Sequence, residues 1–499
     1  MPDIIVQKKN DVHVKVSCDR SIAYELSEYF TFFVPNYQFM PAFRNKEWDG
    51  KIRLYNVMNQ ELYAGLVTYL DKFAKDYGYT VGYAFDRSTI EYSLFEAKEW
   101  FDGMNFPLED REYQLECLVH AIRNKRQLFL SATSSGKSFM MYSLIRKVAN
   151  KKTLIVVPTV QLVHQMASDF AEYGLDSDKF VHKIYEGQDH NTDKPIVIST
   201  WQSIWRKRKD WFRKFGIVIG DEVHTFKANS LISMMEKIEH CPYRIGFTGT
   251  LDDTETHRLV LEGLFGPVKK IISAKEMIEQ GYSSEFEIKI ICLEHKDEVR
   301  KACSQAKTVM VEGHKKRVYP KYQEEIDVLI GVPSRNRYIR NLALSLNGNS
   351  LVLFQYVEKH GKVLYDMIKD KAGDRKVFFV HGGVAGDERE RIRQIVETET
   401  NAIIVASYGV FSTGVNIKNL SNLIFASPSK AKIKILQSIG RILRKTDNPD
   451  VPDRATLFDI ADDVSWKSRQ CYAIQHMKER VKIYKNEGFT FKMYNVKLG

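Results

Sequence analysis

Apolar and polar positions follow a repeating order over most of the chain. From about residue 101 onward, short apolar runs alternate with stretches whose apolar residues have the spacing of a helix. Alternating strands and helices predict a parallel sheet covered by helices on both faces. A first series of strands is predicted at 128–130, 153–157, 196–199, 217–219 and 244–247.

A second series of the same kind follows farther along the chain. Its strands are predicted at 351–354, 377–380, 402–406, 422–425 and 456–460. Because both series have similar size and spacing, they predict two related α/β domains in tandem, each a doubly wound parallel sheet. The breakers between them are Gly263, Gly266, Pro267 and Gly281. We therefore assign residues 101–270 to the first domain and residues 271–465 to the second.

The two ends of the chain have other patterns. Residues 1–100 combine strand signals (within 4–16, 48–55 and 79–85) with helical spacing (21–33 and 62–77), which predicts a small α+β domain. Residues 466–499 predict a basic helix and a strand that pack on the second domain. The segment 294–323 is charged and favours helix, and the sequence assigns it no function.

Aromatic and basic residues are mixed within the N-terminal region. Such a mixture could stack on bases and follow phosphates, which would make residues 1–100 a nucleic-acid-binding domain. The alternative is that the aromatic rings are core and the charges are a solvated face. The residues concerned are Tyr37, Phe39, Phe43, Arg44, Lys46, Trp48, Lys51 and Arg53.

Composition limits the class of protein. The chain has 499 residues, which is too long for one core, so about three domains are expected. It carries 44% hydrophobic and 27% charged residues, as globular proteins do, and no apolar run approaches a membrane span. The N-terminus lacks a signal-peptide core. We therefore expect no membrane partner. We expect the protein to be cytoplasmic, in the host cytoplasm if it comes from a phage.

Charge and cysteine content narrow the partners. The net charge is +11, which favours polyanions, although a basic protein without a nucleic-acid role has the same balance. The cysteines are scattered and form no C-x-x-C pair, which argues against a disulfide framework and a zinc site. They are Cys18, Cys117, Cys241, Cys292, Cys303 and Cys471.

A phosphate-binding loop is predicted at residues 131–138, which read Ser-Ala-Thr-Ser-Ser-Gly-Lys-Ser. The segment follows an apolar strand and precedes an apolar helical stretch, which is the context that such a loop requires. Lys137 would reach the β- and γ-phosphates of ATP, and the Ser138 hydroxyl would ligate Mg²⁺. Backbone groups of the small residues would surround the phosphates. These are Thr133, Ser134, Ser135 and Gly136; serine stands at 131 and 134, where glycine is usual.

An acidic pair is the second candidate site. Asp221 and Glu222 come directly after the predicted strand at 217–219. Asp221 would hold Mg²⁺ and Glu222 would orient the attacking water, since phosphoryl transfer depends mainly on positioning and charge stabilisation. The alternative, a solvated acidic turn, is less favoured because of the upstream loop. His224 either couples hydrolysis to the substrate strand or caps the turn.

The order of these motifs resembles that of superfamily-two helicases, which have two RecA-like domains, over about residues 107–465. The resemblance implies that Arg111 and Gln114 belong to a glutamine motif that reads adenine. It implies backbone contacts to nucleic acid at Pro158, Thr159, Gln161, Thr200 and Gln202. Thr248 and Thr250, together with His224, would link hydrolysis to strand movement.

The resemblance extends into the second domain. Further nucleic-acid contacts are implied at Phe354, His381, Gly382 and Thr413. Gly414 and Asn416 would lie near the nucleotide, and Asn416 replaces the aspartate of many relatives, which removes a charge there. Gln437 would contribute to coupling. Arg441 and Arg444 would be arginine fingers, which can raise turnover by about 10³–10⁵.

A closer resemblance is to UvsW-type helicases of T-even-like bacteriophages. The points of likeness are the whole length, the N-terminal Trp48-Asp49-Gly50-Lys51-Ile52-Arg53 and the serine-rich loop ahead of Asp-Glu-Val-His. That family implies remodelling of branched DNA by fork regression, Holliday-junction branch migration and R-loop unwinding, in recombination, repair and replication. Expected partners are single-stranded and branched DNA, RNA–DNA hybrids, and a recombination or single-strand-binding protein.

Other functions stay open at this point. The same motor could be a double-strand DNA translocase or an RNA helicase, and no wedge hairpin is evident in the sequence. A nucleic-acid-binding scaffold with a decayed site is disfavoured by the intact Lys137, Asp221, Glu222, Arg441 and Arg444. A restriction motor would need a nuclease partner, and no acidic nuclease motif is evident in residues 1–100.

Overall fold

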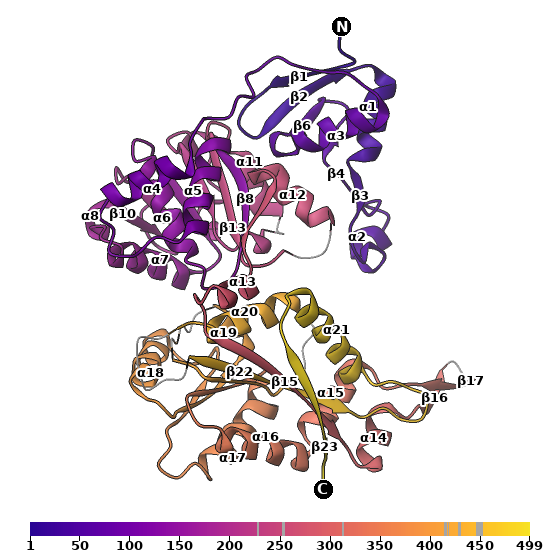
Figure 1. The fold of residues 1–499 in the computed structure, drawn as a ribbon. Helices are drawn as coiled ribbons and strands as arrows, with labels where there is room; N and C mark the ends of the chain where they lie inside the picture. Colours follow the sequence, from indigo (N-terminus) through magenta and orange to yellow (C-terminus); the bar gives the residue numbers. More distant parts are fainter. Residues whose placement is uncertain are drawn as a thin grey trace. The chain divides into compact units, whose positions relative to one another are not determined.

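The structure is a computed structural model of the whole chain (Figure 1). It describes all residues except 227–228, 252–254, 312–313, 414–416, 418, 428–430 and 446–452. The chain forms two compact units, Met1–Ile272 and Ser273–Gly499. Each unit contains one seven-stranded parallel sheet, and the first unit also carries a small mixed sheet. The predicted fold class is therefore confirmed.

The large sheet of the first unit is parallel throughout. Its strand order is β10-β11-β9-β12-β13-β8-β14. The five inner strands coincide closely with the predicted series, whereas the two edge strands β10 and β14 were missed because two consecutive basic residues interrupt each apolar run. The bounds are β8 (Arg126–Ser131), β9 (Thr153–Val157), β10 (Val181–Ile184), β11 (Ile196–Thr200), β12 (Ile217–Gly220), β13 (Tyr243–Thr248) and β14 (Val268–Ile272).

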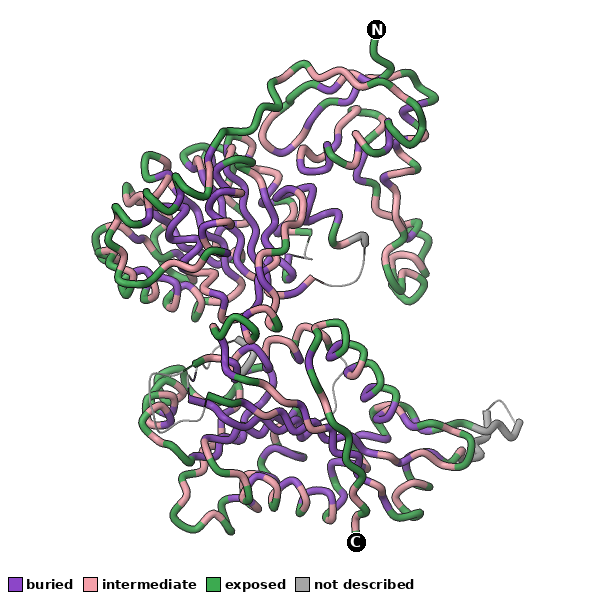
Figure 2. Tube along the Cα trace, in the orientation of Figure 1, coloured by how far each residue is buried: buried purple, intermediate pink, exposed green. Residues whose placement is uncertain are grey.

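Helices cover this sheet and bury its central strands, which are purple in Figure 2. Helix α7 shows why the local sequence folds as it does. The Thr159 side chain caps its first turn by accepting from Leu162, and Val163, Met166 and Phe170 bury one face. The helices are α4 (Leu94–Gly103), α5 (Glu112–Asn124), α6 (Lys137–Lys147), α7 (Val160–Glu172), α8 (Ser177–Phe180), α9 (Trp201–Ile204), α10 (Lys209–Phe212), η3 (Val223–Thr225), α11 (Asn229–Glu236) and α12 (Glu255–Phe265).

The N-terminal domain is a five-stranded mixed sheet in the order β5-β6-β2-β1-β7. The predicted helix at 62–77 is partly wrong, because Leu62 pairs with Val14 of β2 and only the later residues are helical. The elements are β1 (Ile4–Lys8), β2 (His13–Cys18), α1 (Arg20–Tyr29), β3 (Thr31–Phe33), η1 (Tyr37–Phe39), α2 (Pro41–Arg44), β4 (Lys51–Arg53), β5 (Tyr55–Asn56), β6 (Glu61–Tyr63), η2 (Ala64–Leu66), α3 (Val67–Tyr77) and β7 (Val81–Tyr83).

The N-terminal domain shares its apolar core with the first large sheet. A side chain at Gly65 would lie only 1.9 Å from the backbone oxygen of Glu262 in α12, so the two backbones touch. The Tyr63 hydroxyl donates to Glu236 of α11 at 2.6 Å, and the Asp11 amide donates to the carbonyl of Glu239 at 2.9 Å. One continuous hydrophobic cluster includes residues of both sheets. The two sheets therefore form a single packed body.

The sheet of the second unit is also parallel throughout, in the order β19-β20-β18-β21-β22-β15-β23. Its ten-residue strand β15 was not predicted, because its apolar run is broken by Glu287 and Lys289. The predicted C-terminal strand joins the sheet beside β15. The bounds are β15 (Glu285–Glu294), β18 (Ser350–Phe354), β19 (Val377–Val380), β20 (Ile403–Ser407), β21 (Asn422–Phe425), β22 (Arg454–Asp463) and β23 (Phe491–Lys497).

The charged segment 294–323 is not all helical. It contains the antiparallel hairpin β16 (Lys307–Val311) and β17 (His314–Val318), in which β-branched residues favour strand over helix. The helices of this unit are α13 (Ala274–Glu279), α14 (Asp297–Ser304), α15 (Tyr322–Ile330), α16 (Pro333–Ser345), η4 (Val357–Gly361), α17 (Lys362–Lys369), α18 (Gly386–Thr398), α19 (Tyr408–Thr413), α20 (Lys432–Ile442) and α21 (Tyr472–Asn486).

Buried ion pairs tie the strands of the second unit to its helices. Asp462, at 0% exposure, accepts from Arg335 at 2.8 Å and from His295 at 2.9 Å. Burial alone would raise the pKa of Asp462, but Arg335 and His295 hold that pKa well below its ordinary value. A second buried carboxylate, Asp459, accepts from Arg480 at 2.8 Å. These pairs are internal to one unit and have no ligand-facing role in the structure.

Candidate nucleotide and nucleic-acid site

The predicted phosphate loop lies between β8 and α6, at the carboxyl edge of the first large sheet. This edge is where ligands bind in open parallel sheets. Gly136 has φ +81° and Ser134 has φ +71°, so the loop contains two left-handed residues. The buried hydroxyls of Ser131 and Ser135 are hydrogen-bonded at 2.7 Å, which explains why serine suits position 131. The Lys137 ammonium donates to the Ala132 carbonyl at 3.4 Å and so lies over its own loop.

The acidic pair lies at the same edge, directly after β12. Asp221 is 7% exposed, and burial raises its pKa to about 7, with Glu222 adding to the rise and Lys137 opposing it. Glu222 has φ +49°, a left-handed conformation that is costly for a residue with a side chain. Strain of this kind is common at functional sites. The fold thus keeps a carboxylate in a place where its charge is not fully balanced by protein groups.

The motif after β13 is bound to the acidic motif. The Thr248 hydroxyl lies 2.9 Å from Nδ1 of His224, and the same ring nitrogen lies 3.2 Å from a Glu222 carboxylate oxygen. Thr248 also donates to the carbonyl of Thr250 at 2.7 Å. A side chain at Gly249 would lie 3.3 Å from the Thr133 hydroxyl and 3.6 Å from the Lys137 ammonium. The three predicted motifs therefore meet at one place.

The glutamine motif reaches the phosphate loop from α5. Gln114 Nε2 and the Tyr113 hydroxyl both donate to the carbonyl of Ser135, at 3.1 and 2.9 Å. Arg111 donates to the Tyr113 hydroxyl at 3.0 Å. Among the described residues, the buried Gln114 Oε1 has no hydrogen-bond partner. A buried acceptor of this kind suits a ligand that brings a donor, as the adenine amino group does.

The residues present fit a magnesium ion. Hard oxygen donors are what Mg²⁺ prefers, and Ser138 and Asp221 supply a hydroxyl and a carboxylate. The raised pKa of Asp221 shows that a nearby cation would be favourable. The Ser138 hydroxyl lies 2.8 Å from the hydroxyl of Tyr173, a contact that the sequence analysis missed. No sequence signal pointed to Tyr173, because it lies just beyond helix α7 and belongs to no recognised motif.

The predicted backbone-contacting residues of this unit lie after β9 and β11, at the same carboxyl edge. Pro158 and Thr159 are half-buried, and Gln161 is exposed on the first turn of α7. Exposed Gln202 donates to the carbonyl of Pro158 at 3.4 Å, so the two motifs are in contact. Thr200 is buried, and its hydroxyl lies 2.9 Å from that of Ser203. Gln202 and Gln161 are thus the members with exposed side chains.

The predicted residues of the second unit lie at the ends of strands, on or after helix α20, and at or beyond the end of helix α19. His381 and Gly382 follow β19, and Phe354 ends β18, again at carboxyl ends. The Phe354 ring is fully buried, 5.6 Å from the ring of Phe379, so it offers no surface to a ligand. Gln437 and Arg441 are half-buried on α20, and Arg444 follows that helix. Thr413 ends α19, and both Gly414 and Asn416 lie outside the described residues.

The structure sorts the aromatic and basic residues of the N-terminal domain. We call the segment from Thr31 to Arg53 the β3–β4 lobe. Tyr37 and Phe43 pack edge to face at 4.7 Å, and Arg53 is paired with Asp49. Phe39 is 68% exposed with the Arg44 guanidinium 5.9 Å from its ring, and Phe33 is 53% exposed with Lys51 at 4.9 Å. Some of these rings are therefore packed within the lobe, whereas Phe33 and Phe39 are exposed beside cations, and nucleic-acid binding by the lobe stays a prediction.

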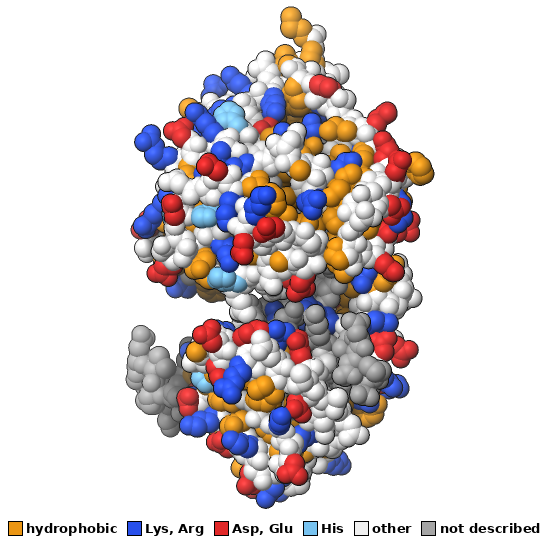
Figure 3. Space-filling model, turned by 90° about the vertical axis from the view of Figure 1, so that its left-hand side faces the viewer, with side chains coloured by type: hydrophobic (Ala, Val, Ile, Leu, Met, Phe, Trp, Pro, Cys, Tyr) orange, Lys and Arg blue, Asp and Glu red, His pale blue; other side chains and the backbone are white. Residues whose placement is uncertain are grey.

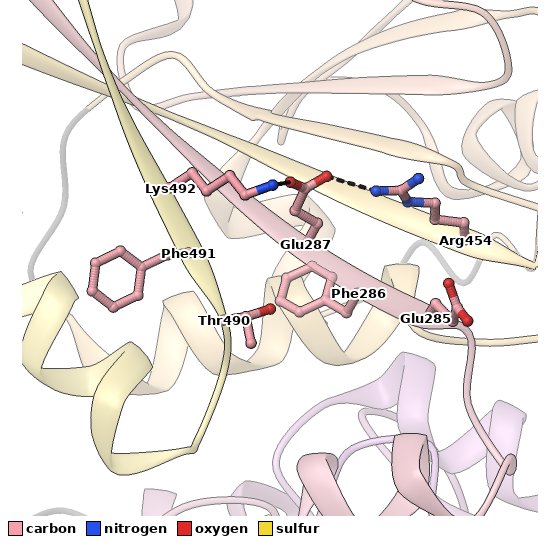
Figure 4. Close-up of a pocket in the computed structure, with 7 residues that line it drawn as sticks. All are labelled: Glu285, Phe286, Glu287, Arg454, Thr490, Phe491 and Lys492. Carbon is pink, nitrogen blue, oxygen red and sulfur yellow. Dashed lines mark hydrogen bonds and ion pairs between the residues drawn. The ribbon is translucent and has the colours of Figure 1, made fainter.

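The second unit also contains a pocket, whose lining residues are drawn in Figure 4. Its volume is about 250 Å³, and it opens at the amino ends of β15, β22 and β23. Glu287 in this pocket forms ion pairs with Arg454 at 2.8 Å and Lys492 at 3.5 Å. The charges there balance one another within the protein. We assign this pocket no part in the nucleotide site, because Glu287, Arg454 and Lys492 in it are paired with one another.

Charged side chains of both signs share one face of the molecule. On the face drawn in Figure 3, Lys and Arg side chains are interspersed with Asp and Glu. Within the described ranges, we find no helix that combines the length and the apolar composition needed to cross a bilayer.

Known proteins resemble this chain in all its parts. Three families match separate ranges: "DNA helicase UvsW, N-terminal" matches 3–84, "Type III restriction enzyme, res subunit" matches 107–253, and "Helicase conserved C-terminal domain" matches 334–446. The ATP-dependent DNA helicase uvsW of Enterobacteria phage T4 is 33% identical over 522 residues, 99% of this chain and 100% of the relative.

Two further comparisons extend this result. The crystal structure of the T4 protein covers 100% of both chains at 31% identity, with a TM-score of 0.51. The DNA 3'-5' translocase XPB2 of Sulfurisphaera tokodaii is 25% identical over 370 residues, 69% of this chain and 82% of that protein.

Fold and motifs together define the class of protein. Two parallel sheets in tandem, with a phosphate loop and an Asp-Glu pair at one edge, are those of a superfamily-two helicase. The full-length similarity to the T4 protein goes further: the chain belongs to the UvsW family of DNA helicases. It is therefore an enzyme, an ATP-dependent helicase, and the resemblance seen in the sequence is confirmed.

Proposed function

We propose that this helicase uses ATP and Mg²⁺ to remodel branched DNA, by fork regression, Holliday-junction branch migration and R-loop unwinding. One observation carries the proposal: the loop at 131–138, the acidic pair and Thr248 meet at one sheet edge, in a chain that matches a phage DNA helicase over its full length. The meeting of these groups supports triphosphate chemistry, and the full-length match supports the DNA substrate.

Each residue of the first unit has a proposed role in hydrolysis. Lys137 holds the β- and γ-phosphates, and backbone amides from Thr133 to Gly136 surround them. Ser138 and Asp221 would hold Mg²⁺, which would neutralise the charge that develops during phosphoryl transfer. Glu222 orients the attacking water and accepts its proton. Gln114 and Arg111 recognise the base, and the buried Gln114 Oε1, which has no hydrogen-bond partner among the described residues, supports this role.

The second unit supplies the cations that hydrolysis requires. Arg441 and Arg444 are the proposed arginine fingers, and Gly414 and Asn416 are proposed to lie near the triphosphate. ATP binding and hydrolysis would each change the conformation of the motor. His224, Thr248, Thr250 and Gln437 would transmit that change. The hydrogen bond between His224 and Thr248 supports this role, because it joins the acidic motif to the motif after β13.

Nucleic acid is proposed to bind along the carboxyl edges of both sheets. Pro158, Thr159, Gln161, Thr200 and Gln202 would contact the sugar–phosphate backbone in the first unit. His381, Gly382 and Thr413 would do so in the second, where the buried Phe354 would act through its backbone. Contacts of this kind position a strand without reading its sequence, so sequence specificity should be low and binding should weaken steeply with salt.

The β3–β4 lobe is proposed as an additional DNA contact. The exposed rings of Phe33 and Phe39, each with a cation beside it, offer the combination of stacking and charge that single strands favour. RNA–DNA hybrids are proposed substrates as well. A recombination or single-strand-binding protein is a proposed partner, on the strength of the branched-DNA role alone.

The decisive experiment compares ATP hydrolysis across a panel of nucleic acids. The panel contains no nucleic acid, single-stranded DNA, linear duplex, forked and four-way DNA, single-stranded RNA, and RNA–DNA hybrid. We expect the highest turnover with branched or single-stranded DNA. The Lys137→Ala variant should lose turnover about 100-fold or more, because a group that stabilises transition-state charge is removed. Its circular dichroism spectrum should match that of the unmodified protein.

Other outcomes separate the alternatives. Stimulation by RNA alone would make the chain an RNA helicase, and stimulation by linear duplex without strand separation would make it a double-strand translocase. Turnover that ignores every nucleic acid would contradict the motor itself. A Lys137→Ala variant with unchanged turnover would show that the nucleotide site has been placed wrongly.

A further inference from the structure

The contact between Ser138 and Tyr173 is the observation from which a new role follows. Ser138 is the second residue of α6, and its hydroxyl lies 2.8 Å from the Tyr173 hydroxyl. The two residues come from different helices, 35 positions apart. A serine hydroxyl that ligates a metal gives the ion a lone pair, and its proton then needs an acceptor. The Tyr173 oxygen is placed to be that acceptor.

Tyr173 is held firmly at the end of α7. Its amide donates to the carbonyl of Asp169 at 3.0 Å, which completes the last turn. Gly174 follows with φ +91°, its amide donates to the carbonyl of Ala171, and the Leu175 amide donates to that of Phe170, each at 3.0 Å. This pair of bonds is the Schellman motif, a defined way to end a helix. The backbone of Tyr173 therefore has one conformation.

The ring of Tyr173 is held as well. It lies edge to face with Phe139 at 5.0 Å, and 5.6 Å from the ring of Tyr142. Both neighbours belong to α6, the helix that begins at Lys137, near the end of the predicted phosphate loop. Aromatic pairs at such distances stabilise one another beyond the area that they bury. The hydroxyl thus approaches Ser138 from a fixed direction.

We propose that Tyr173 is a positioning residue for magnesium: its hydroxyl oxygen accepts a hydrogen bond from the Ser138 hydroxyl and so turns a lone pair of Ser138 toward the ion. The inference rests on the proposed function of Ser138. Residues that orient a metal ligand in this way usually change metal affinity about 10–100-fold when they are removed. Tyr173 touches neither nucleotide nor DNA in this role, and it acts only through Ser138.

The aromatic group around Tyr173 offers a matched control. Tyr142 belongs to the same group of rings, but its hydroxyl accepts from Arg146 at 2.7 Å. Tyr173→Phe and Tyr142→Phe each remove one hydroxyl and leave the ring. A general effect of loosened packing would appear in both variants, whereas an effect through Ser138 would appear in one.

The test measures binding of a fluorescent adenosine diphosphate as a function of magnesium concentration, without DNA and without turnover. For Tyr173→Phe we expect the half-saturating magnesium concentration to rise about tenfold. For Tyr142→Phe we expect no change. In a Ser138→Ala background, Tyr173→Phe should have no further effect, since the two changes remove one interaction. Thermal unfolding of each variant reports whether the fold is kept.

The possible failures are distinguishable. A Ser138→Ala variant with normal magnesium dependence would contradict the proposed nucleotide site itself. If Ser138→Ala loses that dependence but Tyr173→Phe stays within twofold of the unmodified protein, only the role of Tyr173 is overturned. An equal rise in both tyrosine variants would also overturn it, because packing would then explain the change.

Discussion

The two large sheets have the same topology but differ in the partners of the buried aspartates that β12 and β22 position. In the first unit, Asp221 lies beside another carboxylate, Glu222, and its pKa is raised to about 7. Arg244, fully buried there, donates to three backbone carbonyls at 2.8–3.0 Å. In the second unit, the buried carboxylates Asp459 and Asp462 are each bonded to a buried arginine.

This difference in the partners of buried carboxylates distinguishes a candidate ligand site from a structural ion pair. A buried carboxylate without a matching cation stays available to an ion that a ligand brings, at a cost to the stability of the fold. A buried carboxylate with its own arginine is already satisfied, and its removal leaves an uncompensated charge. A buried aspartate can thus serve a ligand site or a structural ion pair, and its partners indicate which of the two roles it has.

The largest effect is expected from Asp221→Asn. The change keeps the shape of the side chain and removes the charge that holds Mg²⁺, which stabilises the transition state by several kcal/mol. Turnover should fall about 10³-fold, at 1.36 kcal/mol per factor of ten. Steady-state hydrolysis with saturating DNA measures this. The first unit should be as stable as before or more stable, and a large loss of its stability would contradict the distinction drawn here.

The same change in the other sheet, Asp462→Asn, should act on stability. It leaves the Arg335 guanidinium buried without its carboxylate, and breaking a buried pair in this way costs about 3–5 kcal/mol. Hydrogen exchange read by mass spectrometry can follow peptides of β15 and β22 separately from those of β9 and β12. We expect faster exchange in the former only. Unchanged exchange across the second unit would show that the pair is dispensable.

The pH dependence of stability should distinguish the two units by a smaller amount. Because the pKa of Asp221 is raised in the folded state, its contribution to stability is present at low pH and is lost as pH rises toward and through about 7. Between pH 5.5 and 8 the loss should be about 2 kcal/mol, at 1.36 kcal/mol per pKa unit. The pKa of Asp462 is lowered, so its contribution is present above pH 4 and is lost only in acid.

Urea denaturation of the nucleotide-free protein at the two pH values tests this. The loss should be present in the unmodified protein and absent from Asp221→Asn, which removes the titrating group while the histidines remain. If both proteins lose the same stability between pH 5.5 and 8, Asp221 is not the cause.

The sequence predicts most of this architecture because the inner strands of both sheets are buried on both faces. Such strands are continuous apolar runs, as in Thr153–Val157, and these are easy to recognise. The edge strands β10 and β14 carry charged residues and were missed for that reason, and the inner strand β15 was missed because Glu287 and Lys289 interrupt its apolar run. The hairpin β16–β17 was missed because a basic segment resembles a surface helix until its β-branched residues are weighed.

The residues of the candidate site differ in whether sequence spacing alone could identify them. Lys137, Ser138, Asp221 and Glu222 lie at fixed distances from their strands, so sequence spacing was enough to propose them. Tyr173 and the buried Gln114 Oε1 became visible only in three dimensions, because a hydrogen bond between distant helices leaves no local pattern. For Phe354 the sequence was misleading about exposure. Its place in a motif suggested an exposed ring, but the ring is fully buried.

The position of β15 has a consequence for how the chain is made. This strand, Glu285–Glu294, pairs with β22 and β23, which the ribosome produces much later. Ribosomes add about 5–20 residues per second, so β15 waits roughly 10–30 s for its first neighbour. During that time its apolar residues, Ile288, Ile290 and Leu293, have no sheet to join. The first unit can mature in the meantime, and the nascent second unit is where a chaperone would be needed.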